Sequence, residues 1–261
     1  MRAPLQLKKT FEIRSTETDL WDRIHVDQLF SMMQETASIH ARVLGTGADV
    51  LDEIGYVFLL SGMSLRLDSY PMWGDEIEIT TWCREIVSLY FIRDFRIQTT
   101  DGREIGRATS TWFLTDKESH RPVRPSVIEQ LIEHYVFPSD SALGFNAPRL
   151  KKWQLEFGEQ DSFKKFADFS DVDRNRHVNN TRYIAWANDF YYHHRGIEAP
   201  RVLKGIDINY LAEVKYGEAV KILGKMTEYS ALDEIEEASE AISIEGRDVQ
   251  QRVLFRAVLY D

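Results

Sequence analysis

The spacing of hydrophobic residues changes period along this chain, and the same order of periods occurs twice. Apolar positions recur every three or four residues from Val26 to Leu44 and from Tyr183 to Tyr191, which predicts two long amphipathic helices. The segments expected to be strands are residues 10–17, 56–70, 75–87, 89–99, 103–115, 162–168, 201–213, 218–228, 235–245 and 249–260, with a short helix at 126–134. Short turns join the late strands, so we predict an α+β fold in which antiparallel sheet wraps each long helix.

Start and stop signals stand at the ends of these elements. Gly45 and Gly47 are expected to end the first long helix. Asn179 or Asn180 can cap the second, because a short amide side chain accepts hydrogen bonds from the first-turn N–H groups. Gly246 is expected in the turn between the last two strands.

Three weak sequence matches in the same order predict that the chain is a duplication. The matches are residues 19–27 with 171–179, residues 65–74 with 208–217, and residues 107–116 with 252–261, at offsets of 152, 143 and 145. Residues 137–152 contain two prolines and show little periodicity, which is typical of a linker. We therefore predict an N-terminal unit at residues 1–136, a linker at 137–152 and a C-terminal unit at 153–261.

A polar run with many functional groups precedes the second long helix. It contains Asp171, Asp173, Asn175, His177, Asn179 and Asn180. Its first three members match ligand positions of a calcium loop, but Arg176 replaces the required glycine and Arg182 replaces the bidentate glutamate, so we predict no metal site. Two interpretations remain: a solvated loop that ends in a helix cap, and a site for general acid–base chemistry centred on His177.

The duplication provides an internal comparison for this run. At the offset of 152, His25 lies over His177, but Arg23 replaces Asn175. At the offset of 143, Tyr70 stands where the second copy has Glu213. Only the second copy then keeps Asp, Asn, His and Glu together, which favours the acid–base interpretation. We predict that the second unit is catalytic and that the first is a degenerate copy that holds substrate.

Composition narrows the setting of such a site. With 43% hydrophobic and 12% aromatic residues, the chain can form a substantial core. A net charge of −10 argues against non-specific binding to nucleic acid. The single cysteine, Cys83, rules out an intrachain disulfide and suits a reducing compartment. No signal-peptide pattern and no apolar run of ~20 residues is visible, so we expect a cytoplasmic protein without a membrane span.

The motif from Asp173 to Trp186, DRNRHVNNTRYIAW, resembles the signature of acyl-acyl carrier protein thioesterases of the plant FatA/FatB type and their bacterial relatives. The segment Gln34 to His40 and the block Asn209 to Glu213 also resemble that family. The resemblance covers roughly residues 10–260. It implies a double (tandem) hotdog fold and hydrolysis of the thioester between a fatty acyl chain and the phosphopantetheine of acyl carrier protein.

The resemblance also implies the residues of the site. The catalytic positions of the family fall on Asp173, Asn175, His177 and Glu213. Some plant members carry a cysteine after the glutamate, but Val214 stands there, which excludes a cysteine–histidine mechanism at that position. No cofactor and no metal are expected. Cys83 is expected in the core of the first unit.

Several features of the reaction stay open at this stage. Water can attack directly, activated by Glu213 or Asp173, or Asp173 can attack and form a mixed anhydride. We expect N–H groups at the start of the second helix to receive the oxyanion, and Glu213 to be partly withdrawn from water near His177. Alternative functions are an acyl-CoA thioesterase and a non-catalytic acyl-binding protein. The quaternary state is expected to be a monomer or a homodimer.

Two further groups of residues are expected to bind the substrate. Met33 and Leu60 in the first unit are expected to line a tunnel for the acyl chain, although core packing is the simpler role for either residue alone. Basic residues at positions 151, 152, 195, 201 and 204 can form a docking area for the acidic carrier protein, or a solvated face.

Overall fold

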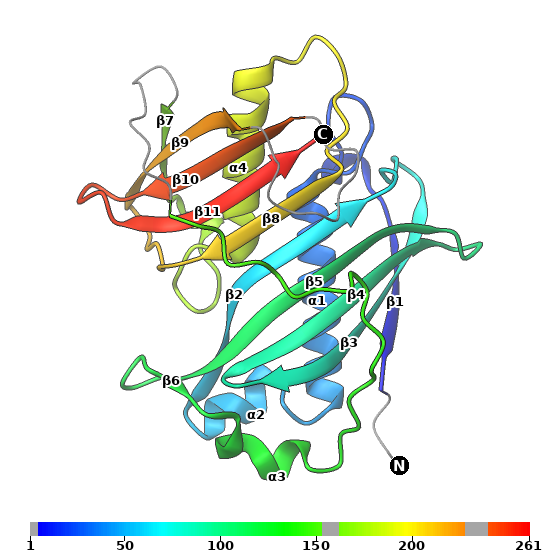
Figure 1. The fold of residues 1–261 in the computed structure, drawn as a ribbon, viewed down its shortest axis with the longest axis vertical. Coiled ribbons are helices and arrows are strands. Elements are labelled where there is room, and N and C mark those ends of the chain that lie inside the picture. Colours follow the sequence, from blue (N-terminus) through cyan, green and yellow to red (C-terminus); the bar gives the residue numbers. More distant parts are fainter. Residues whose placement is uncertain (1–4, 153–161, 228–239) are drawn as a thin grey trace. The chain divides into compact units, whose positions relative to one another are not determined.

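The computed structural model of the chain describes residues 5–152, 162–227 and 240–261 (Figure 1). It divides into two compact units: a first unit of Met1–Ile24 and Gln28–Ala147, and a second unit of His25–Asp27 and Pro148–Asp261. Each unit pairs one long helix with a curled antiparallel sheet. This arrangement confirms the predicted α+β class with two hotdog units.

The first unit builds its sheet from β1, which precedes α1 (Val26–Val43), and from four long strands that follow it. The strand order is β1-β3-β4-β5-β2, with every neighbouring pair antiparallel. The strands are β1 (Leu7–Glu12), β2 (Tyr56–Leu67), β3 (Glu76–Val87), β4 (Tyr90–Thr99) and β5 (Glu104–Asp116), and the short β6 (Pro122–Val123) pairs with β5. Two short helices, α2 (Ala48–Glu53) and α3 (Glu129–Ile132), complete the unit.

The second unit repeats the plan around α4 (Asn180–Arg195). Its strand order is β8-β11-β10-β9-β7, again antiparallel throughout. The strands are β7 (Ser162–Phe166), β8 (Gly205–Tyr210), β9 (Ala219–Thr227), β10 (Ala241–Arg247) and β11 (Val253–Tyr260). The apolar stripe of α4 is buried as its period predicts, and Asn179 caps the helix by accepting from the N–H of Thr181.

Two glycines have other roles than the sequence predicts. Gly45, with φ +78°, ends α1 as expected, but Gly47 precedes α2, a helix that we did not predict. Gly246 lies within β10 and not in a turn. A Cβ at this position would come within 2.0 Å of the Phe255 ring, which explains why the strand has a glycine there. The turn is formed by residues 248–251, where Gln251 has φ +65°. Residues 235–239 of the predicted strand lie outside the described residues.

Equivalent backbone hydrogen bonds show how the two units correspond. The N–H of Asp22 donates to Asp19 in the first unit, and that of Arg176 donates to Asp173 in the second, both at 3.0 Å. The offset is therefore 176 − 22 = 154, and it also relates the starts of α1 and α4, because 180 − 26 = 154. The predicted offset of 152 is wrong by two residues, because it was drawn by placing one histidine over another.

The pairing of the later strands shows that a second predicted offset, 145, is also wrong. Leu67 pairs with Gly106 in the first unit, and Tyr210 pairs with Phe255 in the second. These pairs give offsets of 210 − 67 = 143, which confirms the predicted value, and 255 − 106 = 149, which replaces the predicted 145. The duplication was predicted correctly, but the equivalence of individual residues needs the hydrogen bonds.

The ion pairs of Glu245 allow a test of the second sheet. Glu245 is 1% exposed and accepts from Arg247 Nη2 at 2.7 Å and from Arg256 Nε at 2.8 Å. Glu245→Ala leaves both guanidinium groups without their carboxylate, so we expect the free energy of unfolding, measured with urea, to fall by about 3 kcal/mol. Glu78→Ala is the matched control, because the side chains of the Lys8–Glu78 pair are 53% and 22% exposed, so the pair should contribute less than about 1 kcal/mol. Equal losses of the free energy of unfolding in the two variants would contradict the stabilising role assigned to the buried Glu245.

Candidate active site

The loop that leads into α4 is held by a buried carboxylate. Asp171 ends the short 3-10 helix η4 (Phe169–Asp171), and its Oδ1 accepts from Arg182 Nε at 2.7 Å. Its carbonyl oxygen accepts from the N–H of Asn179, the cap of α4. Asp171 therefore connects both ends of the polar run to the first turn of the helix, which is a structural role.

The residues between these anchors form a tight turn that presents His177. Asp173 Oδ1 accepts from the N–H of Asn175 at 2.8 Å, and the N–H of Asp173 donates to the carbonyl of His177 at 2.9 Å. Arg176 has φ +65°, a left-handed conformation that an arginine adopts only when its surroundings impose it. The turn thus places Asp173, Asn175 and His177 on one short segment.

The imidazole of His177 meets Glu213, as the sequence predicts. His177 Nε2 lies 3.2 Å from Glu213 Oε2, and the two side chains are 25% and 44% exposed. The expectation that Glu213 is withdrawn from water is wrong, because β8 ends at Tyr210 and Glu213 lies in the loop beyond the sheet. The side chains of the pair are therefore both partly accessible to solvent.

A backbone hydrogen bond brings the two loops together. The N–H of Val178 donates to the carbonyl of Val214 at 2.8 Å. Since Val178 follows His177 and Val214 follows Glu213, this bond sets the distance between the two side chains. Val214 is fully buried, so the connection is shielded from water.

The corresponding place in the first unit is closed. At the offset of 154, Arg23 is the counterpart of His177, and Asp19 and Trp21 are the counterparts of Asp173 and Asn175. Asp19 Oδ2 accepts from Arg23 Nε at 3.1 Å and from Nη2 at 2.8 Å. The Arg23 guanidinium also lies over the rings of Trp21 and Tyr70, 4.6 and 5.2 Å from their centres.

This geometry corrects the predicted role of His25. Its counterpart is Asn179, the cap of α4, and not His177. An arginine that is buried, paired and covered by two rings has no open face for a substrate. The inference that only the second copy carries an acid–base set is therefore strengthened, although the residues on which it was based were misaligned.

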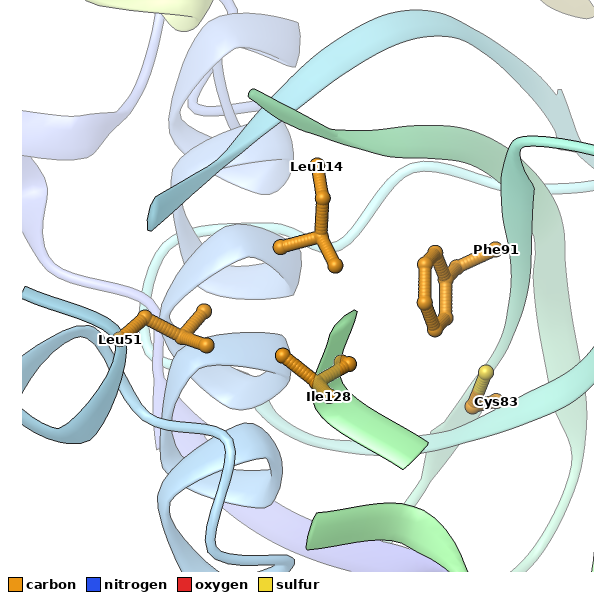
Figure 2. Packing of buried hydrophobic residues seen from close by; sticks show 5 residues of the cluster. All are labelled: Leu51, Cys83, Phe91, Leu114 and Ile128. Atoms are coloured by element: carbon orange, nitrogen blue, oxygen red, sulfur yellow. The ribbon is translucent and has the colours of Figure 1, made fainter. Parts of the chain in front are cut away.

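The single cysteine lies in the core of the first unit, as predicted. Cys83 packs with Leu51, Phe91, Leu114 and Ile128 (Figure 2). Burial raises the pKa of the Cys83 thiol to about 11, so it stays protonated at neutral pH. A thiol is a poor nucleophile, so Cys83 does not offer a competing mechanism.

Several of the residues predicted to bind substrate lie in the core or next to carboxylates of the same chain. Met33 on α1 and Leu60 on β2 are both buried in the first unit, and a role in binding stays a prediction. In the predicted basic area, Arg195 lies against Glu240 and Asp261, and Arg201 also approaches Asp261. Their positive charge is partly neutralised by these carboxylates, which argues against a docking role for these two positions.

The start of α4 offers fewer free donors than expected. Asn179 Oδ1 accepts from the N–H of Thr181, and the carbonyl of Asn179 accepts from the N–H of Arg182. Two of the first-turn N–H groups are thus already used by the cap.

Along residues 5–152, 162–227 and 240–261, no helix combines the length and the apolar character that crossing a membrane requires.

Tyr183 has a polar contact that the hydrophobic pattern did not predict. It was expected only as part of the apolar stripe of α4, but its hydroxyl accepts from the N–H of Val214 at 3.1 Å. The signal that could have found it is the difference between the copies: at the offset of 154, the first unit has Leu29 at this position.

Comparison with known proteins gives consistent matches over both units. The family model described as the acyl-ACP thioesterase N-terminal domain matches residues 4–135, and that of the C-terminal domain matches residues 156–252. A palmitoyl-acyl carrier protein thioesterase of Gossypium hirsutum is 30% identical over 190 residues, which are 70% of this chain and 46% of the relative. An oleoyl-acyl carrier protein thioesterase of Coriandrum sativum is 28% identical over 84% of this chain and 62% of the relative. The chain spans about half the length of the curated relatives it matches.

Solved structures share the fold. An acyl-ACP thioesterase from Bacteroides thetaiotaomicron is similar with a TM-score of 0.76 at 21% identity, over 98% of this chain and 97% of the other. A 12:0-ACP thioesterase from Umbellularia californica is similar with a TM-score of 0.80 at 19% identity, over 98% and 93%. At these identities the likeness establishes the double hotdog fold.

The closed and the open copy should differ in their contribution to stability. Arg23→Ala leaves the mostly buried Asp19 carboxylate without its guanidinium, so we expect a loss of about 3 kcal/mol in the free energy of unfolding. His177→Ala removes a partly exposed side chain and should cost less than about 1 kcal/mol. Urea denaturation of the two variants checks the difference, and a larger loss for His177→Ala would contradict it.

Proposed function

Because this chain belongs to the acyl-ACP thioesterase family, we propose that it hydrolyses the thioester between a fatty acyl chain and the phosphopantetheine of acyl carrier protein. The observation that carries the proposal is the solvent-accessible contact of 3.2 Å between His177 and Glu213 in the second unit. The closed counterpart around Arg23 supports the assignment of the reaction to this unit alone.

The pair supplies the acid–base chemistry that the reaction needs. Glu213 takes a proton from water, and the water oxygen attacks the carbonyl carbon of the thioester. His177 holds the carboxylate through Nε2, and the side-chain amide of Asn175 donates to the oxygen that becomes negative. The carbon–sulfur bond then breaks, and the proton held by Glu213 passes to the leaving thiolate. Asp173 shapes the turn and contributes negative charge beside it.

The acyl chain is assigned to the first unit. The buried face of α1 carries Met32 and Met33, whose flexible side chains adapt to a chain of variable shape. The equivalent face of α4 is filled by rigid aromatic residues, with Tyr183 and Trp186 in ring contact. Several hydrophobic residues around the core of Figure 2 are only partly buried, namely Tyr56, Phe58, Ile86, Trp112, Val123, Ile132, Tyr135 and Phe137. These features support an adaptable apolar site in the first unit.

Charge beside the pair supports an acidic partner. Arg174, Arg176 and Lys215 are exposed and lie next in sequence to the residues of the site. Carrier proteins are acidic, so a basic rim would favour their approach on a chain whose net charge is −10. This rim replaces the area around Arg195 and Arg201 as the proposed docking surface.

The first test is the hydrolysis of acyl-acyl carrier protein, measured beside acyl-CoA. His177→Ala and Glu213→Gln should each lower kcat by ~10²–10⁴-fold, because the first removes the imidazole that holds the carboxylate and the second removes the general base. His134→Ala is the matched control: His134 Nε2 also lies 3.2 Å from a glutamate, Glu133, but on an exposed segment of the first unit. Glu213→Gln with near-normal kcat would assign the reaction to Asp173 alone. An enzyme that prefers acyl-CoA would overturn the carrier assignment.

The second test concerns the acyl chain. Larger side chains, Met33→Trp or Leu60→Phe, should shorten the space for the tail and move the preference toward shorter acyl chains, with little loss of the best rate. Ile244→Phe is the control, because it crowds an equally buried position in the second unit and should lower stability without changing the preference. Rates that fall uniformly for all chain lengths in a folded Met33 or Leu60 variant would place the tail elsewhere.

A further inference from the structure

The hydroxyl of Tyr183 is a buried polar group that contacts the residue after Glu213. Tyr183 lies in the first turn of α4 with 3% of its surface exposed. Its ring is held by Tyr210, Phe255 and Trp186, at centre-to-centre distances of 5.6, 5.4 and 5.5 Å. Aromatic contacts on three sides fix the ring, and with it the position of the hydroxyl.

The group that this hydroxyl holds is the peptide that follows Glu213. The N–H of Val214, which belongs to the Glu213–Val214 peptide, donates to Tyr183 Oη at 3.1 Å. The carbonyl of Val214 in turn accepts from the N–H of Val178, which belongs to the His177–Val178 peptide. Both peptides that carry the side chains of the pair are thus linked through Val214 to one phenol.

The first unit has neither the donor nor the acceptor of the hydrogen bond between the Val214 N–H and the Tyr183 hydroxyl. Leu29 is the counterpart of Tyr183 and has no hydroxyl, and Pro71 is the counterpart of Val214 and has no N–H. The second bond is kept, because the N–H of Ile24 donates to the carbonyl of Pro71 at 2.9 Å. Packing of the loop against the helix therefore does not need the hydroxyl. The tyrosine and its donor occur only in the unit that has the imidazole–carboxylate pair.

We propose that Tyr183 is a positioning residue, which sets the Glu213 carboxylate against the imidazole of His177 by holding the Glu213–Val214 peptide. The inference rests on the proposed function, which assigns the thioester hydrolysis to His177 and Glu213. Tyr183 itself does not touch the substrate.

The charge state of the phenol is consistent with a fixed support. Burial raises the pKa of the Tyr183 hydroxyl. The N–H of Val214 lowers this pKa, and the nearby carboxylates of Glu213, Glu218 and Asp173 raise it. The hydroxyl therefore stays neutral at neutral pH. Its influence on the reaction must pass through geometry.

Tyr183→Phe tests the proposal, because it removes the hydroxyl and keeps the ring. The matched control is Tyr191→Phe, which removes another buried hydroxyl of α4, one that contacts Asp261 Oδ2 at 3.0 Å. We expect Tyr183→Phe to lower kcat by ~10-fold or more, since a 1 Å misplacement can cost ~10²-fold, while KM changes less than twofold. Tyr191→Phe should change stability only. A kcat within twofold of the unsubstituted enzyme in folded Tyr183→Phe overturns the proposal.

A second measurement separates this proposal from the proposed function. The NMR signals of the His177 imidazole, recorded in the full chain, should move in Tyr183→Phe and not in Tyr191→Phe, because the position of the Glu213 carboxylate against the ring changes only in the first. Unchanged imidazole signals in Tyr183→Phe overturn the positioning role. If the unsubstituted chain hydrolyses neither acyl-acyl carrier protein nor acyl-CoA, the proposed function fails, while the imidazole signals still decide whether Tyr183 positions the pair.

Discussion

One backbone hydrogen bond between two loops, made in both units, is the constraint on which the site depends. The bond joins the loop before the long helix to the loop after a sheet strand. In the second unit the N–H of Val178 donates to the carbonyl of Val214, and in the first unit the N–H of Ile24 donates to the carbonyl of Pro71. Its consequence is that the side chains one position earlier must meet. The same scaffold therefore brings together whichever pair the sequence supplies there, and in the second unit this pair is His177 and Glu213.

The two copies use this meeting point in opposite ways. In the first unit a guanidinium is enclosed by a carboxylate and two aromatic rings, which satisfies its charge and removes it from water. In the second unit the imidazole and its carboxylate remain accessible, and the turn before them carries a strained arginine at position 176. A buried and satisfied cluster stabilises the unit that holds it, whereas an accessible pair stabilises little and is available for chemistry.

Periodicity was sufficient to predict the two long helices, most of the strands and the fold class, although it missed α2. The stripe of α4, its cap at Asn179 and the four long strands of the first unit follow from spacing and turn residues, because these signals are local. The meeting of His177 with Glu213 was also anticipated. The equivalence of residues between copies was not, since it depends on hydrogen-bond register, and a histidine two positions away produced a false match. The exposure of Glu213 was missed because apolar neighbours in sequence do not show that a strand has already ended. The hydroxyl of Tyr183 was hidden within a stripe that its ring fully explains.

Pro71 makes it difficult for the first unit to acquire, during evolution, the hydrogen bond that Tyr183 accepts in the second unit. A change of Leu29 to tyrosine alone would bury a hydroxyl opposite a proline that has no N–H to offer. A change of Pro71 to valine alone would bury an N–H opposite a leucine that cannot accept it. Each intermediate carries an unsatisfied polar group, at a cost of ~1–3 kcal/mol, before the second change can compensate it. The hydrogen bond between a tyrosine hydroxyl and the peptide N–H is in this way confined to the second unit, and the two copies stay different at this place.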